Sequence, residues 1–431
     1  MKCLKMIVRF LLITIAVSIS SSTSVLAAEA NIRVGLWTGQ SSIMISANKV
    51  FSVKDPGTND IFGKYNAGEK ILVTQKNGRL YINNLPAKSM VLSVQAEGED
   101  GRTEVNKKAY RGRILIKKAA EGMTVVNDLP LEQYLYSVVP EEMPSTWPAE
   151  ALKAQAVAAR SYALYSLNRH ENEGFDVCAL AHCQVYGGSN VENDIAKKAV
   201  DDTRGQVLVY AHKPIFAAFH ASSGGNTENS EDIWGTYIPY LRSVKDYDRK
   251  SPAYHWTLQI SPTDLSEKLR QYGYDIGNLQ TVTLSGFGSG QSDRSENGAV
   301  KTVIFSGDKS IVKLTGSEVR RVMGLKSTKF AIDVIIPSPK KINVTIDQYS
   351  GYSKDIDVDL PDYKVPKMMT GAGNIHPITN RSGEVVEIEG YGSGHRVGMS
   401  QWGAKALSEQ GYDYQAILYA YYSDVSIEDW Y

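Results

Sequence analysis

The sequence predicts an α+β fold, in which a small β-rich N-terminal region precedes a larger mixed part with a long alanine-rich helix. From Asn31 to about Gln95, short apolar runs alternate with turn residues, which is typical of hairpins. From Pro148 to Leu164, apolar and small residues recur at intervals of three and four, the spacing of a helix. Strand and helix patterns then follow one another to the C-terminus, which indicates a mixed fold.

The length and charge of the chain limit its organisation and its partners. At 431 residues and 42% hydrophobic content, it can bury a large core and is too long for one typical domain. We expect a signal peptide over residues 1–28, a β-rich region over 29–105 and a larger domain over 106–431. The 47 basic residues balance the 47 acidic ones, so net charge gives no reason to expect a nucleic acid or an anionic membrane as partner. A neutral polymer is compatible with this balance.

The first 28 residues have the pattern of a secretory signal peptide. Basic residues occur up to Arg9, residues 10–17 are apolar, and small residues precede Ala28. The alternative is an uncleaved anchor, but the apolar run is short against the ~20 residues that span a bilayer. We expect an exported protein that acts outside the cytoplasm, at the cell envelope.

The remaining elements follow from periodicity and from residues that begin or end helices and strands. A strand pair is expected over RILIKKA and MTVVNDLP, and two strands over QVLVY and PIFAAFHAS. Further strands are expected over Val300–Phe305, Ser310–Leu314 and Phe330–Ile336. Helices are expected over Leu129–Tyr136, Pro148 onward, Glu192–Arg204, Ser261–Tyr272, Ser317–Met323, Ala404–Gln410 and Tyr414–Tyr422.

An acidic loop before the alanine-rich helix is the first candidate site. Pro140 and Pro144 restrict the backbone around Glu141 and Glu142, which predicts a stiff loop. A carboxyl group on such a loop, next to a packed helix, is partly desolvated, which raises its pKa and suits it to donate a proton. Glu142, followed by Met143, is the better candidate. The alternative is that both glutamates are ordinary surface carboxylates.

The helix that follows should start near Pro148 and present one narrow apolar face. Leu152, Ala156, Ala159 and Ala163 form that face, and their small side chains let another element approach closely. Lys153 and Arg160 stand seven residues apart on a common edge, where they could place positive charge near the acidic loop.

The cysteines allow two interpretations. Cys3 would leave with the signal peptide, so Cys178 and Cys183 remain, and in an oxidising compartment they could form a disulfide. His182 and His170 lie near them in the sequence, and two sulfur and two nitrogen ligands suit tetrahedral zinc. Zinc, a disulfide and free thiols all stay open, and in each case the role is structural.

A serine hydrolase is a rival possibility. The segment from His220 to Gly225 places Ser222 and Ser223 near a histidine and near glycine backbone donors. It lacks the G-x-S-x-G elbow, and no partner acid can be assigned.

Five segments in order resemble one known family. They are VVPEEMPSTWPAEALKAQAVAARSYAL from residue 138, CQVYGG from 183, FHASSGGNTENSEDIWGTYIPYLRSV from 219, LTGSEVRRVMGLKST from 314 and GHRVGMSQWGAKALSEQG from 394. From about Tyr110 to the C-terminus, the chain resembles the family of stage II sporulation protein D and the amidase enhancer LytB. Arg396 departs from the family, which usually has glycine at that position.

The resemblance implies a lytic transglycosylase that cleaves peptidoglycan glycan strands stripped of peptides. The position of the family's catalytic acid is Glu142. Its chemistry needs no cofactor, although family members can hold a structural zinc with cysteines and histidines, here Cys178, Cys183, His170 and His182. Substrate contacts are expected from Lys153, Arg160, Ser222, His395 and Gln401. For His395 and Gln401, the alternative is that their glycine-rich loop packs on the alanine-rich helix.

A second function class stays open. The amidase-enhancer branch of the family suggests a non-catalytic wall-binding protein that stimulates an N-acetylmuramoyl-L-alanine amidase. The expected partners are therefore glycan strands and a cell-wall amidase.

Overall fold

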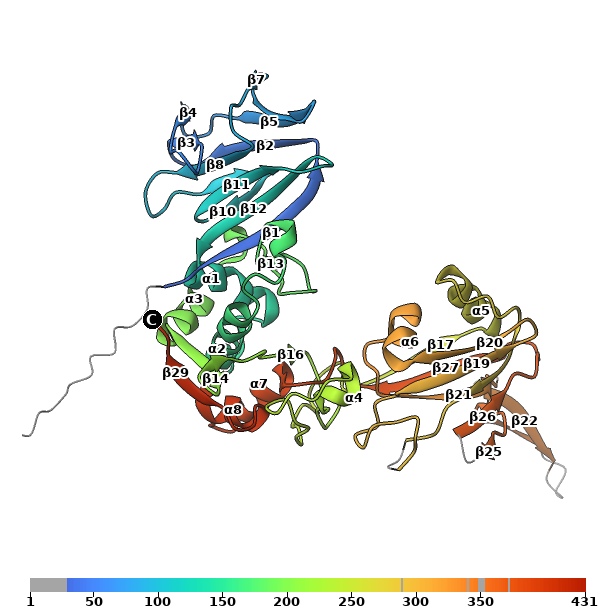
Figure 1. The fold of residues 1–431 in the computed structure, drawn as a ribbon. Helices are drawn as coiled ribbons and strands as arrows, with labels where there is room; N and C mark the ends of the chain where they lie inside the picture. The colour runs from blue at the N-terminus through green and yellow to red at the C-terminus, as the bar shows by residue number, and fades with distance from the viewer. Residues whose placement is uncertain (1–28, 288–289, 339–340, 348–352, 371–372) are drawn as a thin grey trace, which may run out of the picture.

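The computed structural model describes residues 29–431, except 288–289, 339–340, 348–352 and 371–372. The predicted signal peptide falls on residues 1–28 and lies outside the described residues. Figure 1 shows a β-rich unit at the N-terminus, a central part built mainly of helices, and a second lobe with its own sheets. The predicted α+β fold with a β-rich N-terminal region is confirmed.

Two sheets form the β-rich unit. One has the strand order β13-β1-β12-β11-β8-β3-β4, and the other β10-β9-β2-β5-β6-β7. Alternating apolar residues along the strands, such as Ile32, Val34 and Ile45, are fully buried in their core. The strands are β1 Asn31–Gln40, β2 Ser42–Ala47, β3 Phe51–Lys54, β4 Ile61–Tyr65, β5 Ile71–Lys76, β6 Arg79–Ile82, β7 Leu85–Pro86, β8 Val91–Ala96, β9 Thr103–Val105, β10 Lys108–Tyr110, β11 Arg113–Lys118, β12 Met123–Pro130 and β13 Val177–Cys178.

The β-rich unit extends beyond the boundary expected at residue 105. β11 pairs with β8, and β12 pairs with β1 from Asn31↔Pro130 to Gln40↔Met123. The residues around 105 lie in strand β9 and the turn that follows it, inside the unit, because the strands after them return to pair with those before them.

The central part surrounds the alanine-rich helix α2. It contains α1 Leu131–Glu142, α2 Ala149–Tyr165, α3 Asp194–Asp202, α4 Ser230–Trp234, α7 Gln401–Glu409 and α8 Tyr414–Tyr421, with 3-10 turns at Glu171–Glu173 and Ser189–Val191. Its short strands are β14 Gln206–Tyr210, β15 Lys213–Pro214, β16 Phe219–His220, β28 Met399–Ser400 and β29 Ser426–Asp429.

Helix α2 starts at Ala149 with Pro148 as the preceding cap, as predicted. It is buried around its whole circumference rather than along one narrow face. Ala154 and Ala158 are as completely buried as Ala156 and Ala159, because α2 contacts α1 and α3 on one side and α7 and α8 on another. Small side chains allow this close approach of several helices.

The predicted acidic loop is wrong, because α1 continues through Pro140 to Glu142. A proline removes one backbone donor, and in the last turn of a helix this loss is small compared with the packing of the preceding turns. Leu135, Val138 and Val139 are completely buried and hold α1 against the core. Met143 is extended and ends the helix.

The second lobe is inserted in the sequence between α4 and β28. Strands β16 and β28, which flank this part of the sequence, pair in parallel in the central part. Its own core includes Leu269, Phe305 and Phe330. Its elements are α5 Pro262–Gln271, α6 Gly316–Met323, β17 His255–Ile260, β18 Leu279–Thr283, β19 Thr302–Gly307, β20 Ile311–Thr315, β21 Phe330–Ile336, β22 Lys341–Asp347, β23 Ser353–Asp359, β24 Tyr363–Lys364, β25 Met368–Thr370, β26 Gly373–Pro377 and β27 Val385–Tyr391. The single domain expected over 106–431 therefore contains an inserted lobe.

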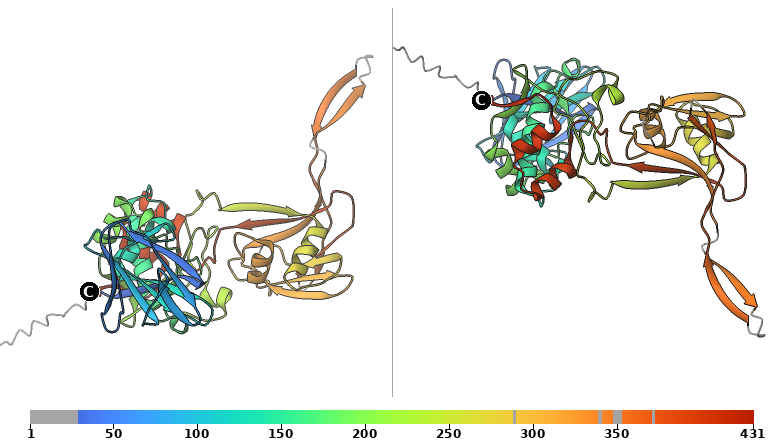
Figure 2. Two further views of the ribbon diagram at one scale, coloured as in Figure 1. Left: turned by 90° about the horizontal axis from the view of Figure 1, so that it is seen from above. Right: turned by 90° about the horizontal axis from the view of Figure 1, so that it is seen from below.

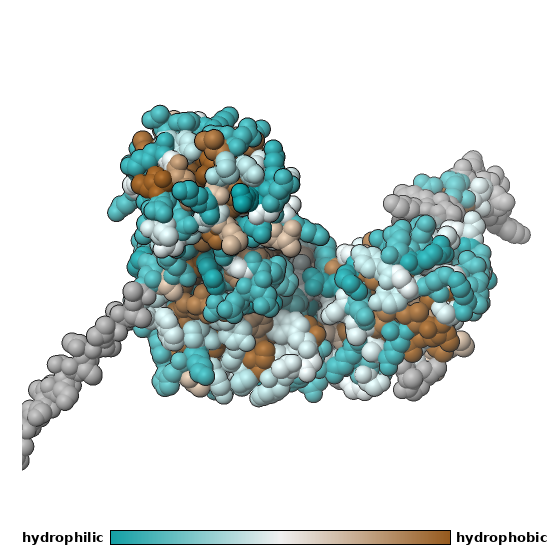
Figure 3. All heavy atoms as spheres, turned by 45° about the horizontal axis from the view of Figure 1, so that its top comes forward, coloured by the Kyte–Doolittle hydropathy of each residue, from teal (hydrophilic) through white to brown (hydrophobic). Residues whose placement is uncertain are grey.

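The sheets of this lobe have the orders β17-β27-β21-β24 and β20-β19-β18-β26-β25, and Figure 2 shows the β22–β23 hairpin projecting from it. Figure 3 shows a concave, mainly hydrophilic surface between the β-rich unit and the second lobe. Within the described part of the chain, no helix is both long and apolar enough to cross a membrane.

Candidate active site around Glu142

Glu142 is a partly buried carboxyl group at the C-terminal end of α1. Its Oε1 accepts a hydrogen bond from the Val185 N–H at 3.0 Å. Its main-chain oxygen accepts a second one from Gln401 Nε2 at 2.9 Å. Segments near residues 142, 185 and 401 therefore meet here, and each belongs to one of the motifs that the sequence singled out.

The surroundings of Glu142 favour its protonated form. Burial raises the pKa of its carboxyl group, the neighbouring Glu141 raises this pKa further, and the Val185 N–H lowers it in part. Among the described residues, no lysine, arginine or histidine forms an ion pair with Glu142. A carboxyl group in such a place can donate a proton near neutral pH.

This raised pKa predicts how activity and stability depend on pH. Proton donation requires the neutral acid, so the rate should fall as pH rises through the folded-state pKa of Glu142. Because the folded-state pKa is raised, protonation of Glu142 stabilises the folded protein at low pH. This contribution to the free energy of unfolding is lost as pH rises through the folded-state pKa. Denaturation of the wild type and a Glu142→Gln variant, between about pH 4 and pH 7, should show the wild type losing stability relative to the variant as pH rises. A constant difference would contradict the buried acid.

Gln401 lies at the start of α7, beside the candidate acid. Ser400 caps the helix by accepting a hydrogen bond from the Gly403 N–H at 3.2 Å. Besides the bond to Glu142, Gln401 Nε2 lies 3.3 Å from Gln155 Oε1 on α2. The side chain is nearly buried and contacts the backbone of the acid, so it positions Glu142. The sequence predicted a substrate contact, which these bonds do not provide.

We expect a Gln401→Ala variant to lose activity with little loss of stability. Without the amide, the end of α1 can shift, and misplacement of about 1 Å can cost up to ~10²-fold in rate. One hydrogen bond contributes only about 1 kcal/mol to stability. Cleavage of glycan strands, the activity that the resemblance implies, and thermal unfolding measure the two effects, with Gln410→Ala at the exposed C-cap of the same helix as control. Equal activity of both variants would remove the positioning role.

Two tryptophans and a lysine lie next to this site. The rings of Trp147 and Trp402 are 4.8 Å apart in an edge-to-face arrangement. Lys405 Nζ lies 4.7 Å from the Trp402 ring. Both rings are partly exposed and offer a surface on which a sugar can pack. Lys405 was not predicted, although its position three residues after Trp402 on one helix could have indicated it.

Lys153 and Arg160 do not contact the candidate acid. Lys153 pairs with Glu150 at 2.9 Å and with Asp202 at 3.7 Å. Arg160 is completely buried, and its guanidinium donates twice to Glu132 at 2.7 Å. The prediction that Arg160 binds substrate is corrected, because a buried ion pair inside the core leaves no donor for a ligand.

Ser222 is also inside the protein. Its Oγ donates to Asp248 Oδ2 at 2.5 Å, and the N–H groups of Gly224 and Gly225 donate to the same carboxylate. His220 Nδ1 lies 3.2 Å from the Val397 carbonyl oxygen and does not contact Ser222. The predicted substrate contact of Ser222 is therefore wrong, because the side chain is completely buried, and the serine–histidine pair that a hydrolase needs is not formed.

His395 lies in a series of packed aromatic rings. Its ring is 5.2 Å from Trp234 and 5.4 Å from His220. Burial lowers the pKa of His395 to about 4, so the imidazole is neutral at physiological pH. The Trp234 ring packs against Phe216, and the Phe216 ring packs against Tyr165. These three rings line a cavity of about 580 Å³. Contact of His395 with a ligand stays a prediction.

Arg396 keeps the backbone shape that glycine would have. Its φ is 67°, in the left-handed region that glycine adopts without strain. Its completely buried guanidinium pairs with Glu228 at 2.9 Å and donates to the carbonyl oxygens of Ser223 and Asn226. The loop therefore has a backbone angle that glycine could adopt, and the Arg396 side chain forms a buried ion pair inside it.

Four predicted metal ligands come together beside the β-rich unit. The ligand atoms of His170, Cys178, His182 and Cys183 all lie within 4.8 Å of one another. Cys183 Sγ is 3.4 Å from His170 Nε2 and 3.5 Å from His182 Nδ1, and Cys178 Sγ is 3.7 Å from His182 Nδ1. Tetrahedral zinc with ordinary bond lengths separates sulfur from nitrogen by about 3.6 Å. The donor set therefore fits zinc, and both cysteines are free thiols.

The carboxylate of Glu173 completes this arrangement. Its Oε1 lies 2.6 Å from His170 Nδ1, which directs the other ring nitrogen toward the cysteines. Cys183 lies two residues before Val185, whose N–H binds Glu142. The cluster thus anchors the segment that contacts the candidate acid.

Comparison with known proteins identifies the family. The family described as "Stage II sporulation protein" matches residues 119–210. An uncharacterised protein of Brachyspira hyodysenteriae is 31% identical over 88% of this chain and 91% of its own length. Stage II sporulation protein D of Bacillus amyloliquefaciens is 32% identical over 70% of this chain and 76% of its own length. The amidase enhancer of Bacillus subtilis is 32% identical over 68% of this chain but 40% of its own length. This chain belongs to the family of stage II sporulation protein D.

Proposed function

We propose that this protein is a lytic transglycosylase that cleaves the glycosidic bonds of peptide-stripped peptidoglycan strands. The observation that carries the proposal is the half-buried carboxyl group of Glu142, with a raised pKa and no cationic partner among the described residues. Its neighbour Glu141 is exposed. One acid suffices when the nucleophile belongs to the substrate, whereas most glycosidases need two carboxyl groups.

The proposed reaction uses Glu142 first as acid and then as base. Its carboxyl proton passes to the glycosidic oxygen as the bond from that oxygen to the muramic anomeric carbon breaks. The 6-hydroxyl oxygen of the same muramic residue then bonds to the anomeric carbon, and its proton passes to the Glu142 carboxylate. The products are a 1,6-anhydro end and a free hydroxyl end. No water is consumed, and the acid is restored.

The relatives support a role at the cell wall. One is named for sporulation and another as an amidase enhancer. We propose that an amidase first removes stem peptides, and that this protein, exported by its predicted signal peptide, then cleaves the bared strands. Finding the full-length chain only in the cytosol would contradict the proposed export.

A non-catalytic amidase enhancer is the second candidate, and the similarity to a protein of that name favours it. The two functions differ in what they release. The test incubates glycan strands, with and without stem peptides, with the mature protein alone, an amidase alone, or both. Mass spectrometry then identifies the products. New 1,6-anhydro ends with the protein alone support the transglycosylase, whereas faster peptide release without new glycan ends supports the enhancer.

We also propose a structural zinc at His170, Cys178, His182 and Cys183. When bound, the metal would hold the segment that carries Val185, and no step of the reaction passes through it. We expect about one zinc per chain and a loss of several kcal/mol of stability on chelation, since metal binding contributes folding free energy. Metal analysis and thermal unfolding measure this, with a Cys178→Ser/Cys183→Ser variant as the chelator-insensitive control. A metal-free protein of unchanged stability, or a disulfide found by mass, would contradict it.

A further inference from the structure

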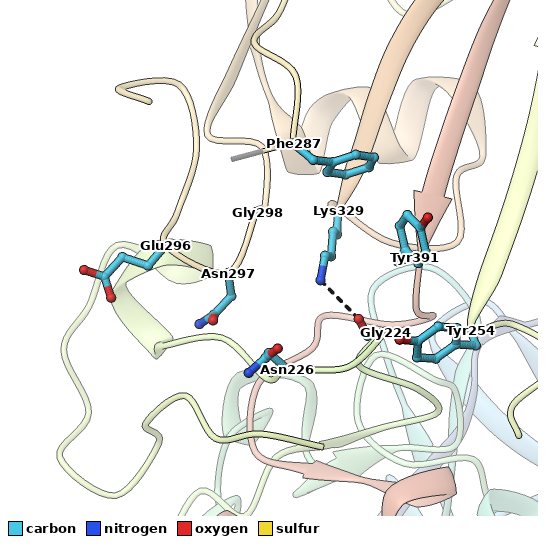
Figure 4. Close-up of a pocket in the computed structure, with 9 residues that line it drawn as sticks. All are labelled: Gly224, Asn226, Tyr254, Phe287, Glu296, Asn297, Gly298, Lys329 and Tyr391. Carbon is cyan, nitrogen blue, oxygen red and sulfur yellow. Dashed lines mark hydrogen bonds between the residues drawn. The ribbon is translucent and has the colours of Figure 1, made fainter. Parts of the chain in front are cut away.

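A pocket of about 420 Å³ lies where the second lobe meets the central part. Gly224 and Asn226 come from the central part, and Tyr254, Phe287, Lys329 and Tyr391 are among the residues that come from the inserted lobe or its edge. Figure 4 shows Lys329 extending between the aromatic rings on one side and Asn226 and Asn297 on the other. The volume suits one sugar-sized group.

Aromatic rings form one wall of this pocket. The ring of Tyr391 is 6.0 Å from Tyr254 and 5.5 Å from Phe287, in both cases edge to face. Phe287 is 41% exposed, so its ring is open to a ligand. Rings held in this way offer flat apolar surfaces, and the C–H face of a sugar can pack on them.

Lys329 supplies a cation that has no carboxylate within ion-pair distance among the described residues. Its Nζ donates to the Gly224 carbonyl oxygen at 3.1 Å, which leaves further donors for a ligand. No carboxylate in the described part of the chain forms an ion pair with it. Burial lowers the pKa of Lys329 to about 8, Arg396 adds to this effect, and the charges of Glu228 and Asp248 oppose it in part. A largely desolvated ammonium gains from an anion placed against it.

Two side-chain amides face the lysine. Those of Asn226 and Asn297 make no hydrogen bond with the residues that the structure describes, and both line the pocket. Figure 4 shows the carboxylate of Glu296 directed away from Lys329 at the outer edge. Amides can donate to and accept from hydroxyl and acetamido groups. Within the described part of the chain, the pocket therefore combines an aromatic wall, two side-chain amides without a hydrogen-bond partner, and one ammonium without a carboxylate at ion-pair distance.

We propose that this pocket binds a carboxylate-bearing N-acetylated sugar, namely a muramic residue whose lactyl carboxylate has been freed from its peptide. This rests on the proposed function, and it names the group by which the protein recognises stripped strands. In a strand that still carries peptides, the lactyl group is an amide, so it offers no charge to Lys329 and is followed by a bulky chain. Lys329 thus takes the role that the sequence had assigned to Lys153 or Arg160.

The test measures binding with the full mature chain carrying Glu142→Gln, which keeps the strands intact. The probes are a peptide-free oligomer of alternating N-acetylglucosamine and N-acetylmuramic acid, and a chitin oligomer with the same number of sugars. Calorimetry should show the muramic oligomer binding about 10-fold more tightly, since a charge-assisted hydrogen bond is added. Lys329→Met, which retains the apolar stem, should abolish this preference.

A second variant keeps the inference testable if Lys329→Met fails to fold. Asn297→Asp places a negative charge at the partly exposed edge of the pocket and should weaken binding of the muramic oligomer but not of chitin. Equal binding of both oligomers, an unchanged preference in either variant, or equal competition by free stem peptide would overturn the inference. These outcomes concern binding alone, so cleavage of stripped strands by the wild type decides the proposed function separately.

Discussion

Replacing Glu142 by glutamine should abolish the formation of 1,6-anhydro ends while leaving the fold intact. The carboxyl group both donates the proton to the leaving oxygen and accepts the proton of the attacking hydroxyl. General acid–base catalysis contributes about 10²–10⁴-fold, and glutamine can do neither step. Glutamine keeps the shape of the side chain and can accept the Val185 N–H through its amide oxygen. We therefore expect turnover to fall by at least about 10²-fold.

The matched control is Glu141→Gln, which removes a neighbouring carboxylate. Glu141 is exposed and contributes only to raising the pKa of Glu142, so this variant should retain most of the activity. Initial rates on peptide-free strands and thermal unfolding of all three proteins measure the effect. Undiminished cleavage by the Glu142→Gln protein would contradict the assignment of the acid, and equal losses in both variants would point to a general effect of charge.

Replacing Arg396 by methionine should destabilise the protein strongly. Arg396 and Glu228 are both completely buried and pair with each other at 2.9 Å. Removal of one partner leaves a buried charge without compensation, which costs about 3–5 kcal/mol. Arg396→Gly, the residue usual in the family, relieves about 1 kcal/mol of strain at the left-handed backbone but leaves Glu228 equally unpaired.

A second substitution, Glu228→Gln, should restore much of the stability that is lost when Arg396 is replaced. In the Arg396→Gly background, it replaces the unpaired charge by a neutral amide that can still accept the Ala299 N–H. Denaturant unfolding of the single and double variants measures the coupling, with Arg381→Met at an exposed position as control, where a change within about ±0.5 kcal/mol is expected. Full stability of the Arg396→Met protein would contradict the importance of the pair.

Several elements could be predicted because local pattern and packing agree in them. β21 has the expected bounds, Phe330–Ile336, since its apolar residues alternate and it lies in a sheet. Helix α2 begins where Pro148 and Glu150 indicate, and α8 spans Tyr414–Tyr421. In β21 and α8, the periodicity of the apolar residues indicates which side is buried.

Other features depend on contacts between distant segments. α1 continues through Pro140 because its earlier turns are buried, which no local rule for proline shows. The burial of Arg160 depends on Glu132, and that of Ser222 on Asp248. The inserted lobe is visible only once β16 is seen to pair with β28.

The residues of the candidate site also divide into those that the sequence could indicate and those that depend on contacts between distant segments. Glu142 as the candidate acid and the cluster of four candidate zinc ligands were predicted from residue type and from the resemblance, and in the structure Gln401 contacts the backbone of Glu142. The Val185 N–H and the pocket around Lys329 were missed, because a backbone donor and a pocket assembled from two lobes leave no local pattern.

The most direct measurement digests peptide-free glycan strands with the mature protein in water enriched in heavy oxygen, followed by mass spectrometry of the new ends. The proposed mechanism predicts 1,6-anhydro ends without any heavy oxygen, because the attacking oxygen belongs to the muramic residue. Reducing ends that carry heavy oxygen would contradict it, since they would show that water is the nucleophile and that a second group must activate it.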